Sequence, residues 1–534
     1  MGSFYLSGQD LRQLDESRIE SLPLERLQEL SKRLAHDLKL AHEQLERDST
    51  TSSLPPSSDL PWTGVSLNEA ELDESEAQEE PTEASAGEAE EIAEAGEVEA
   101  DEPSSTEPKP KPRKAGKQPG APGYGRGVEL PVMDTLRHYP QQCAACAAAL
   151  PETLGQAWTG HYTLDLICGS AQAPGIEVSH VKHVYYETGC DCGHCTRCEP
   201  GRGPSDRQGE ELEWTVDLSE WHLVGPTLMS LIVFLALRMR LSRARIQEIL
   251  ADWLGIYLSI GVLDQCVHEA GRAVEPVEAE LIEALNQAEV LHADETGWKE
   301  GREALWWWVF VSTTTVLFLV GYRRREVIEA VLSATFSGWL MSDGYHAYRH
   351  RDQRLRCWAH LLRKARALKR SYHPASRRFG HDLLELFATL IEAIYHAREG
   401  PPLEEALSVR YHADLEALRV QCHQHQDSEH EATAALAREL LNDWAAIWAV
   451  LDHPQLPLTN NRAEQALRHW VILRKISFGT RTEQGSRALA LLASVIETCR
   501  LRQIKPWPYL AEVIACRRRG EAAPSLPEPV AAAA

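Results

Sequence analysis

Residues 291 to 299 read Leu-His-Ala-Asp-Glu-Thr-Gly-Trp-Lys, and this stretch constrains the fold more than any other part of the chain. An acidic pair, Asp294 and Glu295, stands at the end of a short apolar run and just before a glycine turn. The pattern predicts a buried strand from Val290 to Asp294 that ends in a carboxylate. Because side chains alternate along a strand, His292 and Asp294 share a face and Glu295 points away, so Asp294 is the stronger candidate for a metal ligand.

Asp343 stands in a similar setting further along the chain. It follows an apolar run, 338 to 342, that reads as a second buried strand, and it precedes a glycine. Between the two aspartates, residues 305 to 322 read as a hairpin around a polar Ser-Thr-Thr-Thr centre, and residues 323 to 332 read as a crossover helix. This order of elements can bring Asp294 and Asp343 together at one edge of a sheet.

Glu464 is the third acidic residue that the pattern singles out. It lies one turn into a helix expected to start near Asn460. Arg462 and Arg468 occupy neighbouring positions on this helix and Lys475 follows them, so a carboxylate for metal and basic groups for DNA phosphate would share one element. Taken alone, each acid is better explained as a turn cap or a solvated side chain than as a metal ligand. Their joint contexts reverse this preference and favour a site.

Three carboxylates in these settings suit the chemistry of phosphodiester bonds. Cleavage by two metal ions about 3.5–4 Å apart requires one carboxylate to bridge the ions and others to hold each of them. Hard oxygen ligands favour Mg²⁺ or Mn²⁺ over zinc. The predicted catalytic residues, and the predicted ligands of two Mg²⁺ or Mn²⁺ ions, are therefore Asp294, Asp343 and Glu464.

Six of the twelve cysteines fall in two short clusters, a pattern that indicates a metal site in a reducing compartment. Cys143 and Cys146 have the two-residue spacing that lets both thiolates reach one tetrahedral Zn²⁺. A structural zinc site is predicted, with free thiols as the alternative. The spacing of the second cluster leaves three pairs open as the other two ligands: Cys190 with Cys192, Cys192 with Cys195, or Cys195 with Cys198.

The segment before the first cysteines divides into three parts of contrasting composition. Residues 9 to 48 carry leucines at threes, fours and sevens, which suits a short coiled coil or an amphipathic helix packed on its own protein. Residues 50 to 107 are rich in Ser, Pro, Glu and Ala and are expected to be disordered. A basic stretch, 109 to 126, then includes Lys114 and Lys117 and reads as a DNA-binding arm or as a solubilising linker.

The formal net charge of -24 does not argue against DNA as a partner. Residues 69 to 107 hold 17 acidic and no basic side chains, so the rest of the chain carries only -7 and leaves room for local basic faces. The N-terminus lacks the pattern of a secretory signal, and the longest apolar runs are short or interrupted. We expect a soluble intracellular protein without a membrane segment.

Residues 225 to 272 read as successive helices. Ser242 and Ser259 can each cap a helix, and Gly255 breaks the chain between them. This arrangement is typical of a helix-turn-helix and would place Arg243 and Arg245 near phosphates, although a packed helical bundle has the same caps and turns.

Four strings now carry a resemblance to a known family: His-Ala-Asp-Glu-Thr-Gly-Trp, Ser-Asp-Gly-Tyr, Cys-Trp-Ala-His-Leu-Leu-Arg-Lys and Asn-Asn-Arg-Ala-Glu-Gln-Ala-Leu-Arg. Together with the order of the segments before them, they resemble the insertion-sequence-66 family of bacterial transposases from about Lys109 to Arg517. The resemblance implies a ribonuclease-H-like core with an Asp-Asp-Glu triad at Asp294, Asp343 and Glu464. It also implies a helical insertion between the last two acids and the help of accessory proteins from the same element.

The resemblance favours Cys190 and Cys192 as the partners of Cys143 and Cys146, while the additional Cys195 and Cys198 and the long Glu-rich linker depart from the family pattern. We expect a multidomain α+β protein. The expected parts are a helical, coiled-coil segment (1–50), an acidic linker with a basic arm (51–127), a zinc module (128–204), a helix-turn-helix-like domain (205–285), a catalytic core (286–359 and 451–500), a helical insertion (360–450) and a C-terminal helix and tail (501–534).

The predicted function is that of a homo-oligomeric transposase that binds the terminal inverted repeats of an insertion sequence and target DNA, and that cleaves and transfers strands. Two alternatives remain open: a metal-dependent nuclease without strand transfer, and a DNA-binding regulator without catalysis. Joining of free 3′-hydroxyl ends to target DNA would distinguish a transposase from the nuclease. Loss of strand chemistry on replacing the three acids would distinguish it from the regulator.

Overall fold

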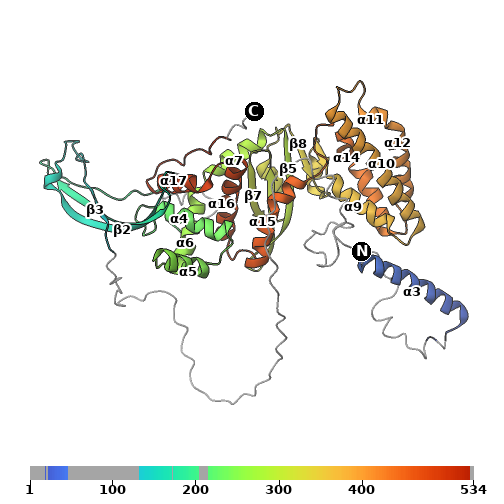
Figure 1. The fold of residues 1–534 in the computed structure, drawn as a ribbon, viewed down its shortest axis with the longest axis horizontal. Coiled ribbons are helices and arrows are strands. Elements are labelled where there is room, and N and C mark those ends of the chain that lie inside the picture. The colour runs from blue at the N-terminus through green and yellow to red at the C-terminus, as the bar shows by residue number, and fades with distance from the viewer. Residues whose placement is uncertain (1–18, 20–21, 46–130, 171, 204–213, 530–534) are drawn as a thin grey trace, which may run out of the picture. The chain divides into compact units, whose positions relative to one another are not determined.

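The computed structural model describes residues 19, 22–45, 131–170, 172–203 and 214–529 (Figure 1). Within them the chain is a mixed α+β protein with two sheets and many helices. The predicted acidic linker and the basic arm with Lys114 and Lys117 lie outside the described residues. None of the described helices combines the length and the apolar character that crossing a membrane requires.

A five-stranded sheet forms the centre of the molecule. Its strands are β5 (Val290–Glu300), β6 (Glu303–Val311), β7 (Val316–Gly321), β8 (Trp339–Ser342) and β9 (Arg354–Arg356). They lie in the order β7-β6-β5-β8-β9; the first three are antiparallel, and β8 and β9 run parallel to β5. The predicted hairpin and the two predicted buried strands are confirmed.

The expected end of the first strand at Asp294 is wrong. β5 continues through Gly297, which pairs with Trp306 of β6, and the chain turns only around Gly301, whose φ is 57°. The threonine and tryptophan that flank Gly297 favour an extended chain and pair across the hairpin, so one glycine does not stop the strand. Asp294 therefore lies within a long β5, at the point where its parallel pairing with β8 gives out.

Helices cover the antiparallel half of the sheet. α15 (Asn461–Ser477) packs against β5 and β6, and α16 (Glu483–Leu501) packs against β7. The short α8 (Arg325–Val331) follows β7 as the predicted crossover helix. The hairpin tryptophans belong to the same core, since Trp307 and Trp308 are fully buried. Figure 1 shows α15 and α16 beside the strands.

The helices before the sheet follow the predicted caps. Ser242 caps α5 by accepting from the Arg245 backbone N–H, and Ser259 caps α6 in the same way. Gly255 ends α5 in the left-handed region, with φ 65°, which glycine adopts at low cost. The helices are α4 (Pro226–Val233) with a π-helical continuation to Arg238, α5 (Arg243–Leu254), α6 (Ile260–Ala273) and α7 (Val277–Asn286).

One hydrophobic cluster joins these helices, the sheet, α15, α16 and the C-terminal α17 (Pro506–Arg518). It runs from Leu164 to Leu526, so the segment predicted as a helix-turn-helix domain shares its core with the five-stranded sheet. The proposed domain boundaries stay a prediction.

The predicted helical insertion is a bundle with a hydrophobic cluster of its own. It begins after β9, and Pro374 stands at the first turn of its longest helix, where a proline is tolerated. Its helices are α9 (Trp358–Lys369), α10 (Pro374–Glu399), α11 (Leu407–Arg410), α12 (His412–His425), α13 (Glu431–Asn442) and α14 (Trp444–Asp452).

The described residues before α4 contain a second sheet and a leucine-rich helix. In the sheet, β3 (Ile176–Gly189) pairs with β1 (Asp134–His138), β2 (Gln156–Cys168) and β4 (Cys195–Arg197). The leucine-rich helix is α3 (Leu24–Leu45), and its coiled-coil pairing stays a prediction.

Candidate active site

Asp294 lies partly buried on β5 in strongly negative surroundings. Its carboxylate accepts the backbone N–H of Glu295 at 2.8 Å, and within the described residues no basic side chain pairs with it. Burial raises the pKa of Asp294 well above its usual range, and the charges of Asp343, Glu295 and Glu464 raise it further. Such a carboxylate needs a cation if it is to be ionised at neutral pH.

Asp343 directly follows β8, the parallel neighbour of β5. The last pair of that ladder joins His292 to Met341, and each aspartate lies two residues beyond its member of the pair. Parallel strands therefore deliver Asp294 and Asp343 to the same point of the sheet. Asp343 accepts the Tyr345 backbone N–H at 2.8 Å, which fixes the turn after the strand.

Asn460 fastens the start of α15 to β5 beside Asp294. Its Nδ2 donates to the carbonyl of Ala293 at 2.9 Å, and its Oδ1 lies 3.1 Å from Nδ1 of His292. Its own backbone N–H points to the Cys357 sulfur at 3.2 Å. Burial lowers the pKa of His292 to about 4, so this imidazole is neutral and bonds Asn460 as an uncharged group.

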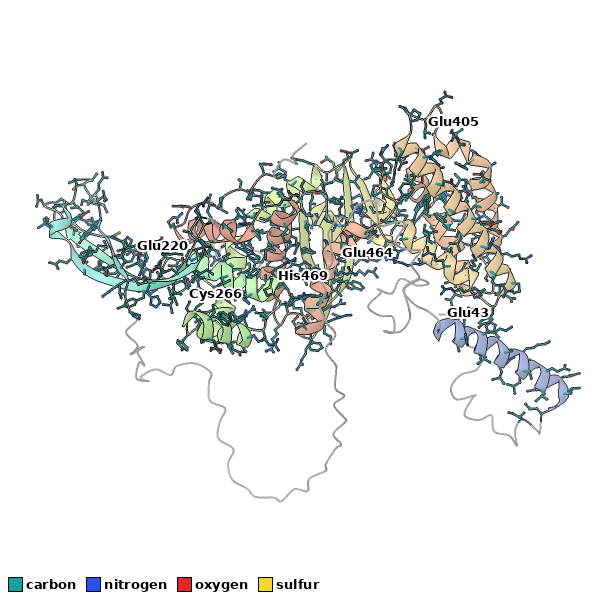
Figure 2. All side chains as sticks on the ribbon, viewed as in Figure 1. Glu43, Glu220, Cys266, Glu405, Glu464 and His469 are labelled. Atoms are coloured by element: carbon teal, nitrogen blue, oxygen red, sulfur yellow. The ribbon has the colours of Figure 1, made fainter. Side chains whose placement is uncertain are left out.

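Glu464, in the first turn of α15, contacts the insertion through His360 of α9. The His360 Nε2 lies 3.1 Å from a carboxylate oxygen of Glu464, and this hydrogen bond lowers the pKa of Glu464 below its usual value. Figure 2 shows Glu464 and His469 on the same helix; His469 instead lies 2.9 Å from the carbonyl of Leu237. α15 thus connects the insertion to the helices that precede the sheet.

Glu295 is not solvated on the opposite face of β5. Its side chain is fully buried and accepts two hydrogen bonds from Arg323, at 2.9 and 2.6 Å, and one from the Tyr348 hydroxyl at 2.7 Å. Arg323 lies over the rings of Trp306 and Tyr345, at 4.4 and 4.0 Å. Glu295 is therefore neutralised within the protein, in contrast to Asp294.

A buried ionic network ties the insertion to the edge of the sheet. Asp443, whose side chain is fully buried, pairs with Arg349 at 3.0 Å, Arg354 at 2.6 Å and Arg356 at 3.1 Å. Burial alone would raise the pKa of Asp443, but the hydrogen bond from Arg354 and the three guanidinium charges bring it below its usual value.

Glu439, one turn earlier on α13, completes this network. It pairs with Arg356 and, at 2.6 Å, with Lys364. A Cβ on Gly344 would lie 2.9 Å from Arg356 and 3.0 Å from Glu439, so a larger residue there would push the ends of these two side chains away from the Asp343 turn.

His360, Asn460 and Glu439 are the neighbours that the sequence did not reveal as such. Their partners lie 75 to 168 residues away, and no periodicity reports a contact of that kind. The pattern Cys-Trp-Ala-His did contain the signal for two of the contacts. Cys357 stands at the start of α9 and contacts Asn460. His360 lies one turn further along α9 and contacts Glu464.

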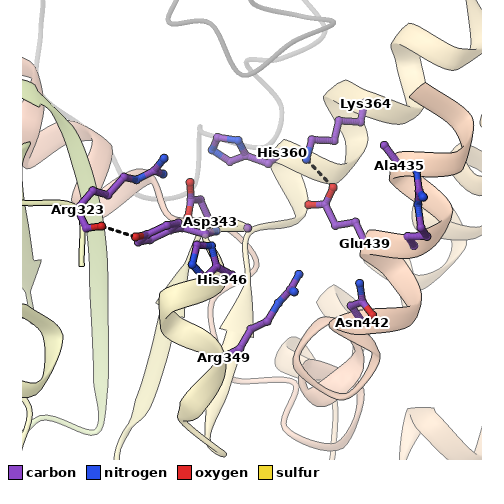
Figure 3. Close-up of a pocket in the computed structure, with 12 residues that line it drawn as sticks. Arg323, Asp343, His346, Arg349, His360, Lys364, Ala435, Glu439 and Asn442 are labelled. Carbon is purple, nitrogen blue, oxygen red and sulfur yellow. Dashed lines mark hydrogen bonds and ion pairs between the residues drawn. The ribbon is translucent and has the colours of Figure 1, made fainter. Parts of the chain in front are cut away.

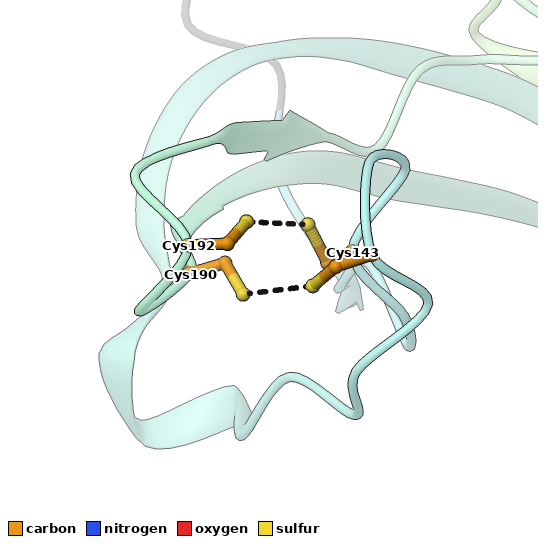
Figure 4. Close-up of side chains that lie close together, drawn as sticks. Cys143, Cys190 and Cys192 are labelled. Atoms are coloured by element: carbon orange, nitrogen blue, oxygen red, sulfur yellow. Dashed lines mark hydrogen bonds between the residues drawn. The ribbon is translucent and has the colours of Figure 1, made fainter.

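The four cysteines favoured as zinc ligands lie together at the end of the N-terminal sheet (Figure 4). Their sulfur atoms all lie within 4.8 Å of one another, with Cys143 3.6 Å from Cys192 and Cys146 3.5 Å from Cys190. Backbone N–H groups of Cys146 and Ala145 lower the pKa of the Cys143 thiol to about 6, which favours the thiolate that a metal requires. The alternates, Cys195 and Cys198, are not part of this group.

The residues predicted to contact DNA differ in their surroundings. Arg243 lies 3.4 Å from Asp264, whereas Arg245 is exposed. Arg462 donates to the Ser312 carbonyl at 3.3 Å. Arg468 and Lys475 are exposed on α15. The neighbouring Arg474 turns back to β5 and bonds Thr296.

Comparison with known proteins adds an independent observation. A model of the family described as "Transposase IS66 family" matches residues 222–488, which include all three acids and the whole insertion. Uncharacterized protein y4hP of Sinorhizobium fredii is 28% identical over 339 residues, covering 55% of this chain and 59% of that protein. Uncharacterized protein y4jD of the same organism is 28% identical over 200 residues, covering 34% and 38%. The chain thus spans less than two thirds of these relatives.

Proposed function

Because the chain belongs to the IS66 family of transposases, we propose that it is a DNA transposase that cleaves and joins strands with a two-metal Asp-Asp-Glu site. The observation that supports this proposal most is the state of Asp294: burial and the charges of Asp343 and Glu464 raise its pKa, and within the described residues no basic side chain pairs with it. A cluster of carboxylates that lacks compensating charge is costly unless cations bind to it.

The sheet supports a ribonuclease-H-like core. Three antiparallel strands are followed by two that run parallel to the first, and the two aspartates come from adjacent parallel strands. The glutamate comes from a helix that packs on β5 after the insertion. The insertion thus separates the acids in sequence while its buried network holds it against the sheet edge.

The donor set fits Mg²⁺ or Mn²⁺. All three proposed ligands offer carboxylate oxygens, which these hard cations prefer. When bound, two such ions would activate water or a 3′-hydroxyl and stabilise the leaving oxygen. The residues of the chain would supply the arrangement: Asp294 and Asp343 from rigid strands, and Glu464 from α15, oriented by His360 and by the Asn460 anchor.

The other parts are proposed to bind DNA and to assemble the active form. Arg245, Arg462, Arg468 and Lys475 are candidates for phosphate contacts, together with Lys114, Lys117 and Arg243. The four clustered cysteines fit a structural Zn²⁺ in their chemistry and spacing. Homo-oligomers, accessory proteins of the element and a place in the bacterial cytoplasm belong to this proposal.

The decisive experiment supplies the protein with pre-cleaved element ends that carry free 3′-hydroxyls, target DNA, and Mg²⁺ or Mn²⁺. Joined product is expected. Replacement of Asp294, Asp343 or Glu464 by Ala is expected to abolish joining and to leave binding of the ends within a few-fold. Cleavage without any joined product would instead identify a nuclease, and binding without chemistry in the unaltered protein would identify a regulator.

A further inference from the structure

A pocket of about 540 Å³ opens beside Asp343, between the sheet edge and the insertion (Figure 3). One wall comes from the turn after β8 and from the 3-10 helix η5 (His346–His350), and the other comes from α9 and α13. Its volume lies within the roughly 300–1,000 Å³ typical of small-ligand pockets. The proposed active site does not account for this space.

The pocket is lined mainly by charged and polar side chains. Four of the lining residues are basic and two are acidic; the basic ones are Arg323, Arg349, Lys364 and Arg438. Behind the lining, Arg354 and Arg356 add two more positive charges against one, that of Asp443. Three of the four basic lining residues pair with carboxylates: Arg323 with Glu295, Arg349 with Asp443 and Lys364 with Glu439. For the fourth, Arg438, no acidic partner is found within the described residues.

The basic side chains that line the pocket differ in how firmly contacts hold them. Arg349 and Lys364 are already paired, with Asp443 and Glu439, and are thereby held in place. Arg438 is exposed on α13, and its one described contact is with the carbonyl of Ala434 at 3.2 Å, on its own helix. Arg349 and Lys364 thus form a fixed basic wall of the pocket. The exposed Arg438 beside them is able to contact a ligand.

We propose that this pocket binds the phosphodiester group that neighbours the cut group in the same DNA strand, with Arg438 as its principal contact. The inference rests on the proposed function, because Asp343 and His360, which border the proposed metal site, also line the pocket. A phosphate there would pair with Arg438 and would fix the register of the strand against the carboxylates. Fixing the strand at two adjacent phosphates orients the reacting bond.

The test measures how the affinity for a random-sequence 40-base-pair duplex depends on salt, in metal-free buffer with the full-length protein. Each phosphate contact contributes about 0.9 to the slope of log K against log salt, so Arg438→Glu is expected to lower the slope by about 1. Arg410→Glu is the matched control, since Arg410 is also exposed on the insertion but does not line the pocket. It is expected to leave the slope unchanged, and both variants should melt within a few degrees of the unaltered protein.

Equal slopes for the unaltered protein and Arg438→Glu, or equal losses in both variants, would overturn the proposal. A free-phosphate site is a further outcome that would overturn it: inorganic phosphate would then bind in an Arg438-dependent way while the DNA slope stayed constant. These results are separate from the proposed function. That function fails if the unaltered protein does not join pre-cleaved ends, and its three-acid site fails if joining survives replacement of all three acids, whatever the slopes show.

Discussion

The Nε2 of His360 lies 3.1 Å from Oε1 of Glu464, although 104 residues separate the two in sequence. The insertion therefore touches the proposed catalytic glutamate directly and does more than lengthen the chain. Residues that orient a metal ligand commonly change metal affinity or activity 10- to 100-fold when they are removed.

His360→Ala is expected to lower strand cleavage by about 10- to 100-fold and to raise the Mg²⁺ concentration needed for half-maximal rate. His360→Gln, which keeps a donor, should recover part of the loss. His396→Ala on the same insertion serves as the control, since the exposed His396 lies 3.9 Å from the equally exposed Glu392. An unchanged Mg²⁺ dependence in His360→Ala would exclude an orienting role.

Replacement of the two adjacent acids of β5 is expected to have opposite consequences. Asp294→Asn should abolish chemistry with little loss of stability, because its carboxylate has only a backbone contact. Glu295→Gln should lower the free energy of unfolding by about 1.5–3 kcal/mol, because it weakens hydrogen bonds to Arg323, and should retain cleavage. Rates and denaturant melts of both variants provide the measurement. Full activity in Asp294→Asn together with loss of activity in Glu295→Gln would assign the metal to Glu295.

Asp443→Asn is expected to reduce the free energy of unfolding by about 3–5 kcal/mol at neutral pH, because it leaves buried arginines without their counter-charge. The pKa of Asp443 is lowered in the folded protein, so its stabilisation is complete above the ordinary value of 3.8 and is lost as the pH falls below it. The variant cannot titrate there, so the difference between the two proteins should narrow below about pH 4. Denaturant melts at several pH values measure this difference, and a constant difference would contradict the assignment.

The cysteine cluster predicts one bound zinc per chain. Cys143→Ser or Cys192→Ser should lose the metal, and Cys195→Ser or Cys198→Ser should keep it, because only the first two belong to the group of clustered sulfur atoms. Metal analysis of the purified proteins measures the outcome. Zinc retained by Cys192→Ser but lost from Cys198→Ser would move the site to the alternates.

Most helices and strands could be predicted because their signals lie within a few residues. Contacts between residues far apart in sequence could not be predicted in this way. The apolar runs before Asp343 and the caps at Ser242 and Ser259 predicted their strand and helices, because burial periodicity and capping act over a few residues. The predicted length of β5 was wrong, because pairing with β6 overrides the turn preference of Gly297.

Two of the ionic partners of Asp443, Arg354 and Arg349, lie 89 and 94 residues away in sequence. Whether an acid on a helix faces solvent or three arginines depends on how the insertion docks, and the spacing of residues on α13 does not encode this. The contact between His360 and Glu464 could not be predicted from the sequence for the same reason. The assignment of the three acids to one metal site remains a prediction that the variants above can decide.

The late position of α15 also sets the order in which the protein matures during its synthesis. A nascent chain that ends at Asp452 already contains β5, β8 and the complete insertion, but it lacks the helix that carries Glu464. Asn460, which attaches that helix to Ala293, has not been made either. The ribosome therefore carries a chain with the proposed DNA-contacting segments and two of the three acids, and the proposed metal site is completed only after the insertion has been made.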